Sequence, residues 1–194
     1  PGLLPTRGYN DPRERSQRVE SPSTFNAEDL ARLNRVSRIA EELTGDYFQL
    51  SAFGPRRYLY DVATAPQLAA EEVAADAFAQ LCRYVATRPS PGDRSRPGRY
   101  YRICLQDANI LEAVRRVDGQ FSLETLLCYI MTHELIHIVR FERFQHPFLT
   151  DPDGREAEEL RVHSLTFDVL STLEEPGMVA LLRYYQTHRI PRCL

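Results

Sequence analysis

Residues 126–144 constrain the fold most, because apolar side chains surround nearly the whole circumference of the helix that this segment predicts. One helical seam steps by three or four residues and consists of Leu126, Ile130, His133, His137, Phe141 and Phe144. The neighbouring stripe is apolar except for Glu134. Such a helix has no polar face for solvent, so we expect it to be buried over about 122–144, with Ser122 as its N-cap.

The same helix contains the pattern His-Glu-x-x-His at residues 133–137. His133 and His137 lie one turn apart on one face, so both imidazoles can ligate the same metal ion. Glu134, beside the first histidine, can reach a metal-activated water without being a ligand itself. In a buried helix these polar side chains are costly unless they have partners, and a metal ion with its water removes that cost.

Two other interpretations of these residues are open. The histidines can be hydrogen-bonded core residues that bind no metal. Glu134 and His137 also match half of the paired Glu-x-x-His motif of di-iron carboxylate bundles. The sequence has no second copy of that motif, so the di-iron interpretation is disfavoured.

A catalytic zinc site normally has three protein ligands and one open position, so a third ligand must come from elsewhere. The next predicted helix, about 155–173, offers four donors: Glu156, Glu158, Glu159 and His163. If this helix packs antiparallel to the first, residues 159–161 lie level with the histidines. Glu159 also shares a helix face with Val162, His163 and Thr166. We therefore favour Glu159 as the third ligand.

The other three donors have second interpretations. Glu156 is the capping-box residue if Asp153 is the N-cap of its helix. Glu158 points away from the favoured face and is expected to be a solvated charge. His163 could be a ligand, could orient a zinc-binding histidine, or could bind a transition-state oxyanion. Arg140 and Arg143 are expected to be solvated or to pair with Glu142.

The remaining segments predict an α+β domain, mostly helical, over 23–194, preceded by a flexible tail at 1–22. Asn26 and Asp29 form a capping box that begins a helix ending at Gly45. Further helices are expected at 66–87, 107–117 and about 177–189. Strands are expected at 46–53, 58–63 and 99–105, and a polar loop at 88–98.

Composition excludes several classes of function. All 24 basic residues are arginine, so Schiff-base and P-loop lysine chemistry is excluded. The net charge of −3 gives no general attraction for nucleic acid, and no apolar run is long enough to span a membrane. The four cysteines (Cys82, Cys104, Cys128 and Cys193) form no Cys-x-x-Cys pair. We expect free thiols in a cytoplasmic protein, with two disulfides in a secreted protein as the alternative.

The His-Glu-x-x-His motif and the acidic helix after it, roughly 122–170, resemble the gluzincins. These zinc metallopeptidases of the zincin group take their third ligand from a glutamate on a following helix. The zinc aminopeptidase spacing points to Glu156, and the thermolysin spacing points to Ala157, which cannot ligate. The metzincin pattern fails, because Arg140 and Arg143 replace its glycine and its third histidine.

The resemblance implies a zincin-like core, with a small β-sheet packed on the motif helix. It implies Zn²⁺ held by His133, His137 and Glu159, and a peptide or protein substrate hydrolysed with Glu134 as general base. It also implies an edge strand that pairs with substrate, for which 99–105 is the candidate unless it is an internal strand. Candidate oxyanion partners near the C-terminus are Tyr184, Tyr185 and His188.

Two alternative functions use the same residues. A closed four-ligand shell, for example with both Glu159 and His163, would make the site structural or regulatory, without turnover. The same groups could also hydrolyse a non-peptide amide.

Overall fold

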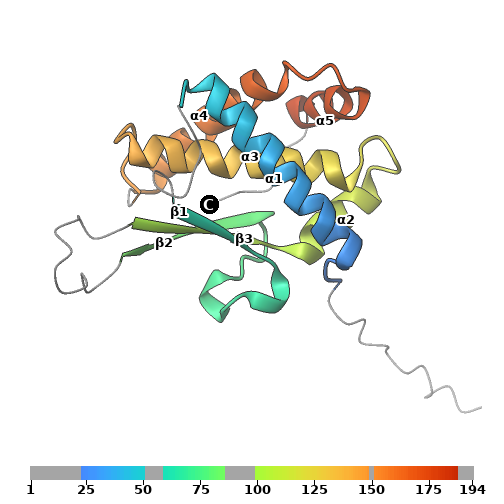
Figure 1. Cartoon of the computed structure of the whole chain (residues 1–194), viewed down its shortest axis with the longest axis horizontal. Helices are drawn as coiled ribbons and strands as arrows, with labels where there is room; N and C mark the ends of the chain where they lie inside the picture. Colours follow the sequence, from blue (N-terminus) through green and yellow to red (C-terminus); the bar gives the residue numbers. More distant parts are fainter. Residues whose placement is uncertain (1–22, 51–58, 86–98, 149–150, 188–194) are drawn as a thin grey trace, which may run out of the picture.

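Residues 23–50, 59–85, 99–148 and 151–187 are described by a computed structural model, in which most residues are helical and a small sheet lies to one side (Figure 1). The helices are α1 (Ala27–Tyr47), α2 (Asp107–Arg116), α3 (Leu123–Glu142), α4 (Pro152–Leu170) and α5 (Pro176–Thr187). The strands are β1 (Leu59–Ala63), β2 (Ala79–Val85) and β3 (Arg99–Leu105). Two short 3₁₀ helices, η1 (Ala65–Gln67) and η2 (Ala70–Glu72), separate β1 from β2. The predicted α+β class is confirmed.

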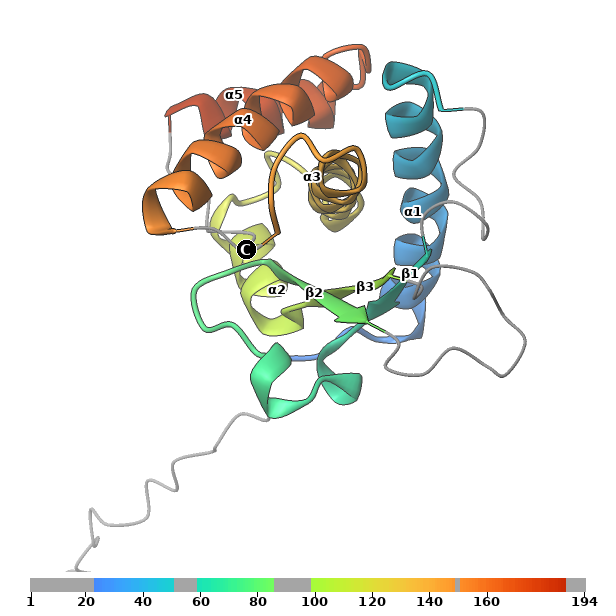
Figure 2. The same cartoon turned by 90° about the vertical axis from the view of Figure 1, so that its left-hand side faces the viewer.

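Helix α3 lies in the middle of the other elements, as the view almost along its axis shows (Figure 2). It contacts α1, α2, α4, α5 and β2, and 17 of its 20 residues are buried. Ser122 caps it by accepting a hydrogen bond from the backbone N–H of Thr125. The predicted buried helix is therefore confirmed, although it ends at Glu142. Phe144 lies beyond this end and is 74% exposed, so it is not part of the buried seam.

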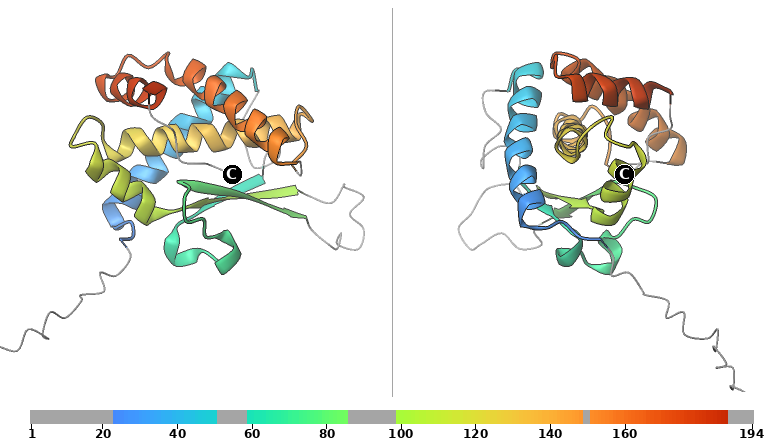
Figure 3. Two further views of the ribbon diagram at one scale, coloured as in Figure 1. Left: turned by 180° about the vertical axis from the view of Figure 1, so that it is seen from behind. Right: turned by 90° about the vertical axis from the view of Figure 1, so that its right-hand side faces the viewer.

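The three strands form one sheet with the order β1-β3-β2. Strand β3 pairs parallel with β1 and antiparallel with β2. Leu81 and Ile103 are opposite each other in the β2–β3 register and belong to the same hydrophobic core as α3. Because side chains alternate along a strand, their neighbours Cys82 and Arg102 are on the opposite face. The segment containing η1 and η2 lies on that side of the sheet, away from α3 (Figure 3).

The predicted helix at 66–87 is wrong. Pro66 begins only the single 3₁₀ turn η1, and the chain then forms η2 and strand β2. Side chains that flank the start of α2 bind the intervening backbone instead. Gln106 binds the backbone N–H of Ala74 and the carbonyl of Glu72, while the Asn109 amide donates to carbonyls of residues 74–77. These tertiary hydrogen bonds satisfy backbone groups that a helix would have paired internally.

Several predicted boundaries also differ from the structure. The capping box of Asn26 is confirmed, but α1 continues past Gly45 to Tyr47, so a strand beginning at residue 46 is wrong. Helix α4 begins at Pro152 because Asp151, not Asp153, caps it. The predicted tail at 1–22, the loop at 88–98 and residues 51–53 of the first predicted strand lie outside the described residues.

Candidate metal centre

Three ligand-type side chains converge between α3 and α4. His133 and His137 come from α3, and their Nε2 atoms are 3.1 Å apart. Glu159 of α4 places Oε1 3.2 Å from Nε2 of His137 and Oε2 3.4 Å from Nε2 of His133. Both histidines are fully buried and the Glu159 side chain is 13% exposed. The predicted grouping of His133, His137 and Glu159 is therefore present in the structure.

The spacing of these atoms fits a tetrahedral metal ion. Nitrogen and oxygen ligands lie about 2.0–2.1 Å from zinc, which separates neighbouring ligand atoms by about 3.3 Å in a tetrahedron. The two imidazole nitrogens are 3.1 Å apart, and each has an oxygen of Glu159 at a similar distance, Oε1 at 3.2 Å from His137 and Oε2 at 3.4 Å from His133. Two imidazole nitrogens and one carboxylate oxygen also form a donor set that zinc accepts.

The protonation of these groups suits a metal ligand set. Burial alone would raise the pKa of Glu159, but the two histidines beside it lower it below its ordinary value. Burial lowers the pKa of His133, so this imidazole is neutral near pH 7. Among the described residues, neither oxygen of Glu159 has an aligned hydrogen-bond donor. A metal ion bound between these groups would pair with the charge of the buried carboxylate.

Thr166 orients the first histidine. Its hydroxyl donates to the carbonyl oxygen of Val162 at 2.8 Å and lies 3.5 Å from Nδ1 of His133. Because the hydroxyl hydrogen is already used, its oxygen can only accept from the imidazole. The proton of His133 is therefore favoured on Nδ1, which leaves the Nε2 lone pair directed toward His137 and Glu159.

Glu158 is buried, which contradicts the expectation that it is a solvated charge. It is 2% exposed, and both of its oxygens accept hydrogen bonds from Arg140, from Nε and from Nη2 at 2.7 Å each. Arg140 is therefore the partner of Glu158, neither solvated nor paired with Glu142. Glu158 Oε1 also lies 4.0 Å from Nδ1 of His137, so its charge favours a proton on that nitrogen.

The structure separates the remaining predicted donors. Glu156 is exposed on α4 and is not part of the cluster. His163 lies at its edge, with Nε2 3.7 Å from Oε2 of Glu159. Its Nδ1 is 2.9 Å from the hydroxyl of Tyr129, a residue that the sequence analysis did not single out. Tyr129 is four residues before His133, the same spacing that separates His133 from His137. Continuing this spacing back by one helical turn could have identified Tyr129.

Glu134 is fully buried on α3, between the two histidines in sequence.

Tyr185 is buried, and its ring centroid is 5.7 Å from that of Tyr129, whereas Tyr184 packs beside Phe121. His188 lies outside the described residues. Burial of Tyr185 in the hydrophobic core gives it a packing role.

Strand β3 is the central strand of the sheet, with β1 and β2 hydrogen-bonded on either side. The candidate edge strand at 99–105 is therefore wrong, because both of its edges are already paired. Any substrate pairing at this sheet would have to use β1 or β2.

No protein-family model matches the chain, and neither the curated proteins nor the solved structures contain a significant match. Among the described residues, no helix combines the length and apolar character needed to cross a membrane.

Replacing Arg140 with Met tests the buried ion pair. The change leaves the Glu158 carboxylate buried without its cation, and we expect the free energy of unfolding to fall by about 3–5 kcal/mol. The exposed pair of Arg35 and Glu124 provides a matched control, and Arg35→Met is expected to cost less than about 1 kcal/mol. Urea denaturation measures both. Equal losses for the two variants would contradict a structural role for the Arg140–Glu158 pair.

Proposed function

We propose that the protein is a zinc-dependent hydrolase of the peptidase type, with a zincin-like core. The observation that carries this proposal is the triangle of His133, His137 and Glu159 ligand atoms on the helix that also contains Glu134. His133 and His137 would hold the ion through Nε2, and Glu159 through its carboxylate. The ion, when bound, supplies a positive charge that acidifies water and polarises a carbonyl group.

Each neighbouring residue then has a defined task. Glu134 takes the proton of the attacking water on its carboxylate and returns it to the leaving amine. Thr166 holds His133 in the Nδ1-protonated form, and Glu158 favours the same form of His137. Arg140 fixes Glu158 through its two hydrogen bonds. We assign hydrolysis of an amide bond, with peptides or proteins as the substrate class and non-peptide amides as the alternative.

A non-catalytic metal site is the second candidate, and the position of His163 favours it. The three motif residues are fully buried, and His163 lies at the edge of the cluster, with its Nε2 3.7 Å from Oε2 of Glu159. Four protein ligands would close the shell and leave no position for a reacting water. In that case the site would join α3 to α4 and stabilise the fold.

Replacing Glu134 with Gln distinguishes the two candidates. The amide cannot take a proton, so we expect hydrolysis of a synthetic peptide library to fall by about 10²- to 10⁴-fold while zinc content is unchanged. Library cleavage is followed by mass spectrometry, and zinc by elemental analysis of the same sample. Glu142→Gln, on the same helix but bonded to Tyr101, is the matched control and should keep activity.

Three outcomes would decide the matter. Zinc-loaded protein that cleaves, with cleavage lost in Glu134→Gln and with both cleavage and the zinc ion of this site lost in His137→Ala, supports the hydrolase. Zinc bound by His133 and His137 with no cleavage of any library member supports the structural candidate. Folded protein that takes up no zinc through these residues overturns both.

Replacing Thr166 with Val tests the orientation of His133. Valine has nearly the same shape but no acceptor for the Nδ1 proton, so we expect zinc affinity to fall by about 10- to 100-fold. Thr172→Val is the control, because Thr172 also donates to a backbone carbonyl, that of Val169, but lies outside the metal cluster. Competition with a chromogenic chelator measures the affinity. Equal affinities of the two variants would contradict the role given to Thr166.

A further inference from the structure

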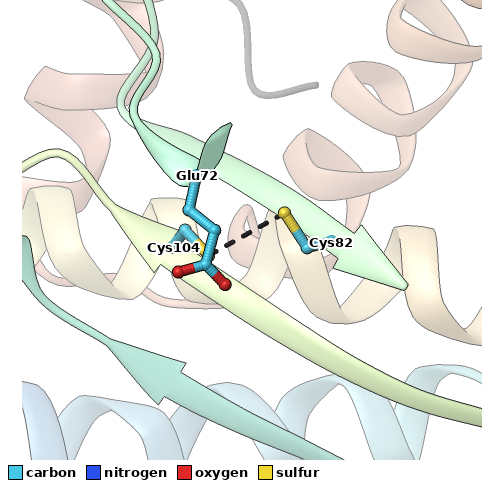
Figure 4. A group of neighbouring side chains, drawn as sticks. All are labelled: Glu72, Cys82 and Cys104. Atoms are coloured by element: carbon cyan, nitrogen blue, oxygen red, sulfur yellow. Dashed lines mark hydrogen bonds between the residues drawn. The ribbon is translucent and has the colours of Figure 1, made fainter. Parts of the chain in front are cut away.

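A second cluster of ligand-type side chains lies on the other face of the sheet. It contains Glu72 of η2, Cys82 of β2 and Cys104 of β3, and their ligand atoms are all within 4.8 Å of one another. Figure 4 shows the carboxylate of Glu72 in front of Cys104, with the Cys82 sulfur beside it and a dashed line that joins the two cysteines. Glu72 and Cys104 are buried, and Cys82 is half-buried.

The two sulfur atoms are placed for a shared ion. Their separation is 4.0 Å, about twice the length of a disulfide bond. Cys82 is opposite Arg102 in the register and Cys104 is opposite Gln80, so the two cysteines are diagonal neighbours across the strands. Diagonal pairs are further apart than a disulfide requires. Two thiolates on one tetrahedral zinc, with bonds of about 2.3 Å, have their sulfur atoms about 3.8 Å apart, close to the observed value.

The charge of the surroundings also favours a cation. Glu72 is 1% exposed, whereas its cationic neighbour Arg102 is engaged mainly by Asp61 through Nε and Nη2. Arg102 reaches Glu72 only through Nη1 at 3.4 Å. Glu72, Asp61 and Arg102 together carry two negative charges and one positive charge, so the net charge of this group is negative.

Glu72 keeps capacity for a metal ligand. Its Oε2 accepts from the backbone N–H of Ala69 at 2.9 Å, and its Oε1 accepts from the Tyr84 hydroxyl at 2.5 Å and from Arg102. A carboxylate has about four lone-pair sites, so three partners leave one for an ion.

We propose that Glu72, Cys82 and Cys104 form a second metal site, which takes a thiophilic divalent cation of the zinc class. Thiolate ligands select zinc and cadmium over magnesium and calcium. The ion would connect η2 to β2 and β3, and so attach the segment between β1 and β2 to the outer face of the sheet. This inference is independent of the proposed hydrolase, because the site shares no residue with His133, His137 and Glu159.

Cobalt(II) provides the direct test, because thiolate ligands give it a near-ultraviolet charge-transfer band that histidine and carboxylate ligands do not. The experiment titrates Co²⁺ into the full chain, kept reduced and folded as judged by circular dichroism. We expect the band to reach its maximum when one Co²⁺ ion per chain is bound at this site. It should persist in His137→Ala and disappear in Cys82→Ser, whose half-buried position favours normal folding.

Matched variants complete the test. Cys128→Ser makes the same chemical change outside the cluster and should keep the full band. Glu72→Gln should keep both thiolates but weaken Co²⁺ binding at least tenfold. No thiolate band in the folded wild-type chain overturns the proposal, and so does a band that survives Cys82→Ser. Loss of the two thiols to a disulfide under reducing conditions, detected by mass, also overturns it.

Discussion

The burial of α3 is the constraint on which the rest of the structure depends. The helix is apolar on every side, so α1, α4, α5 and the sheet must surround it. At its centre it places His133, Glu134 and His137, and each buried polar group costs about 1–3 kcal/mol if it lacks a partner. Helix α4 brings Glu159 to the two imidazoles and Glu158 to Arg140. The arrangement that closes the core therefore also assembles the ligand cluster.

The periodicity of the sequence was enough to predict this part of the molecule. A helix that is apolar around nearly its whole circumference is expected in the interior, and four-residue spacing puts His133 and His137 on one face. The rise of an α-helix and an antiparallel return place Glu159 level with them, and the structure brings these three residues together. Local rules were sufficient because both elements are long, regular helices with ordinary caps.

Features that depend on contacts between distant segments could not be predicted in this way. The segment 66–78 has helical spacing, but Gln106 and Asn109 bind its backbone and prevent a helix. Glu158 faces Arg140 from a second helix, so its burial depends on the packing of two elements and not on either pattern alone. The Glu72–Cys82–Cys104 cluster contains residues from three elements, and no spacing in the sequence predicts it.

The most direct measurement is a crystal structure of zinc-supplemented protein, with anomalous differences recorded on both sides of the zinc absorption edge. If zinc binds as proposed, we expect an edge-dependent peak about 2.0–2.1 Å from Nε2 of His133, from Nε2 of His137 and from a carboxylate oxygen of Glu159. A map with no peak between these residues, and with the two imidazoles still in contact, would contradict the metal centre and the function built on it.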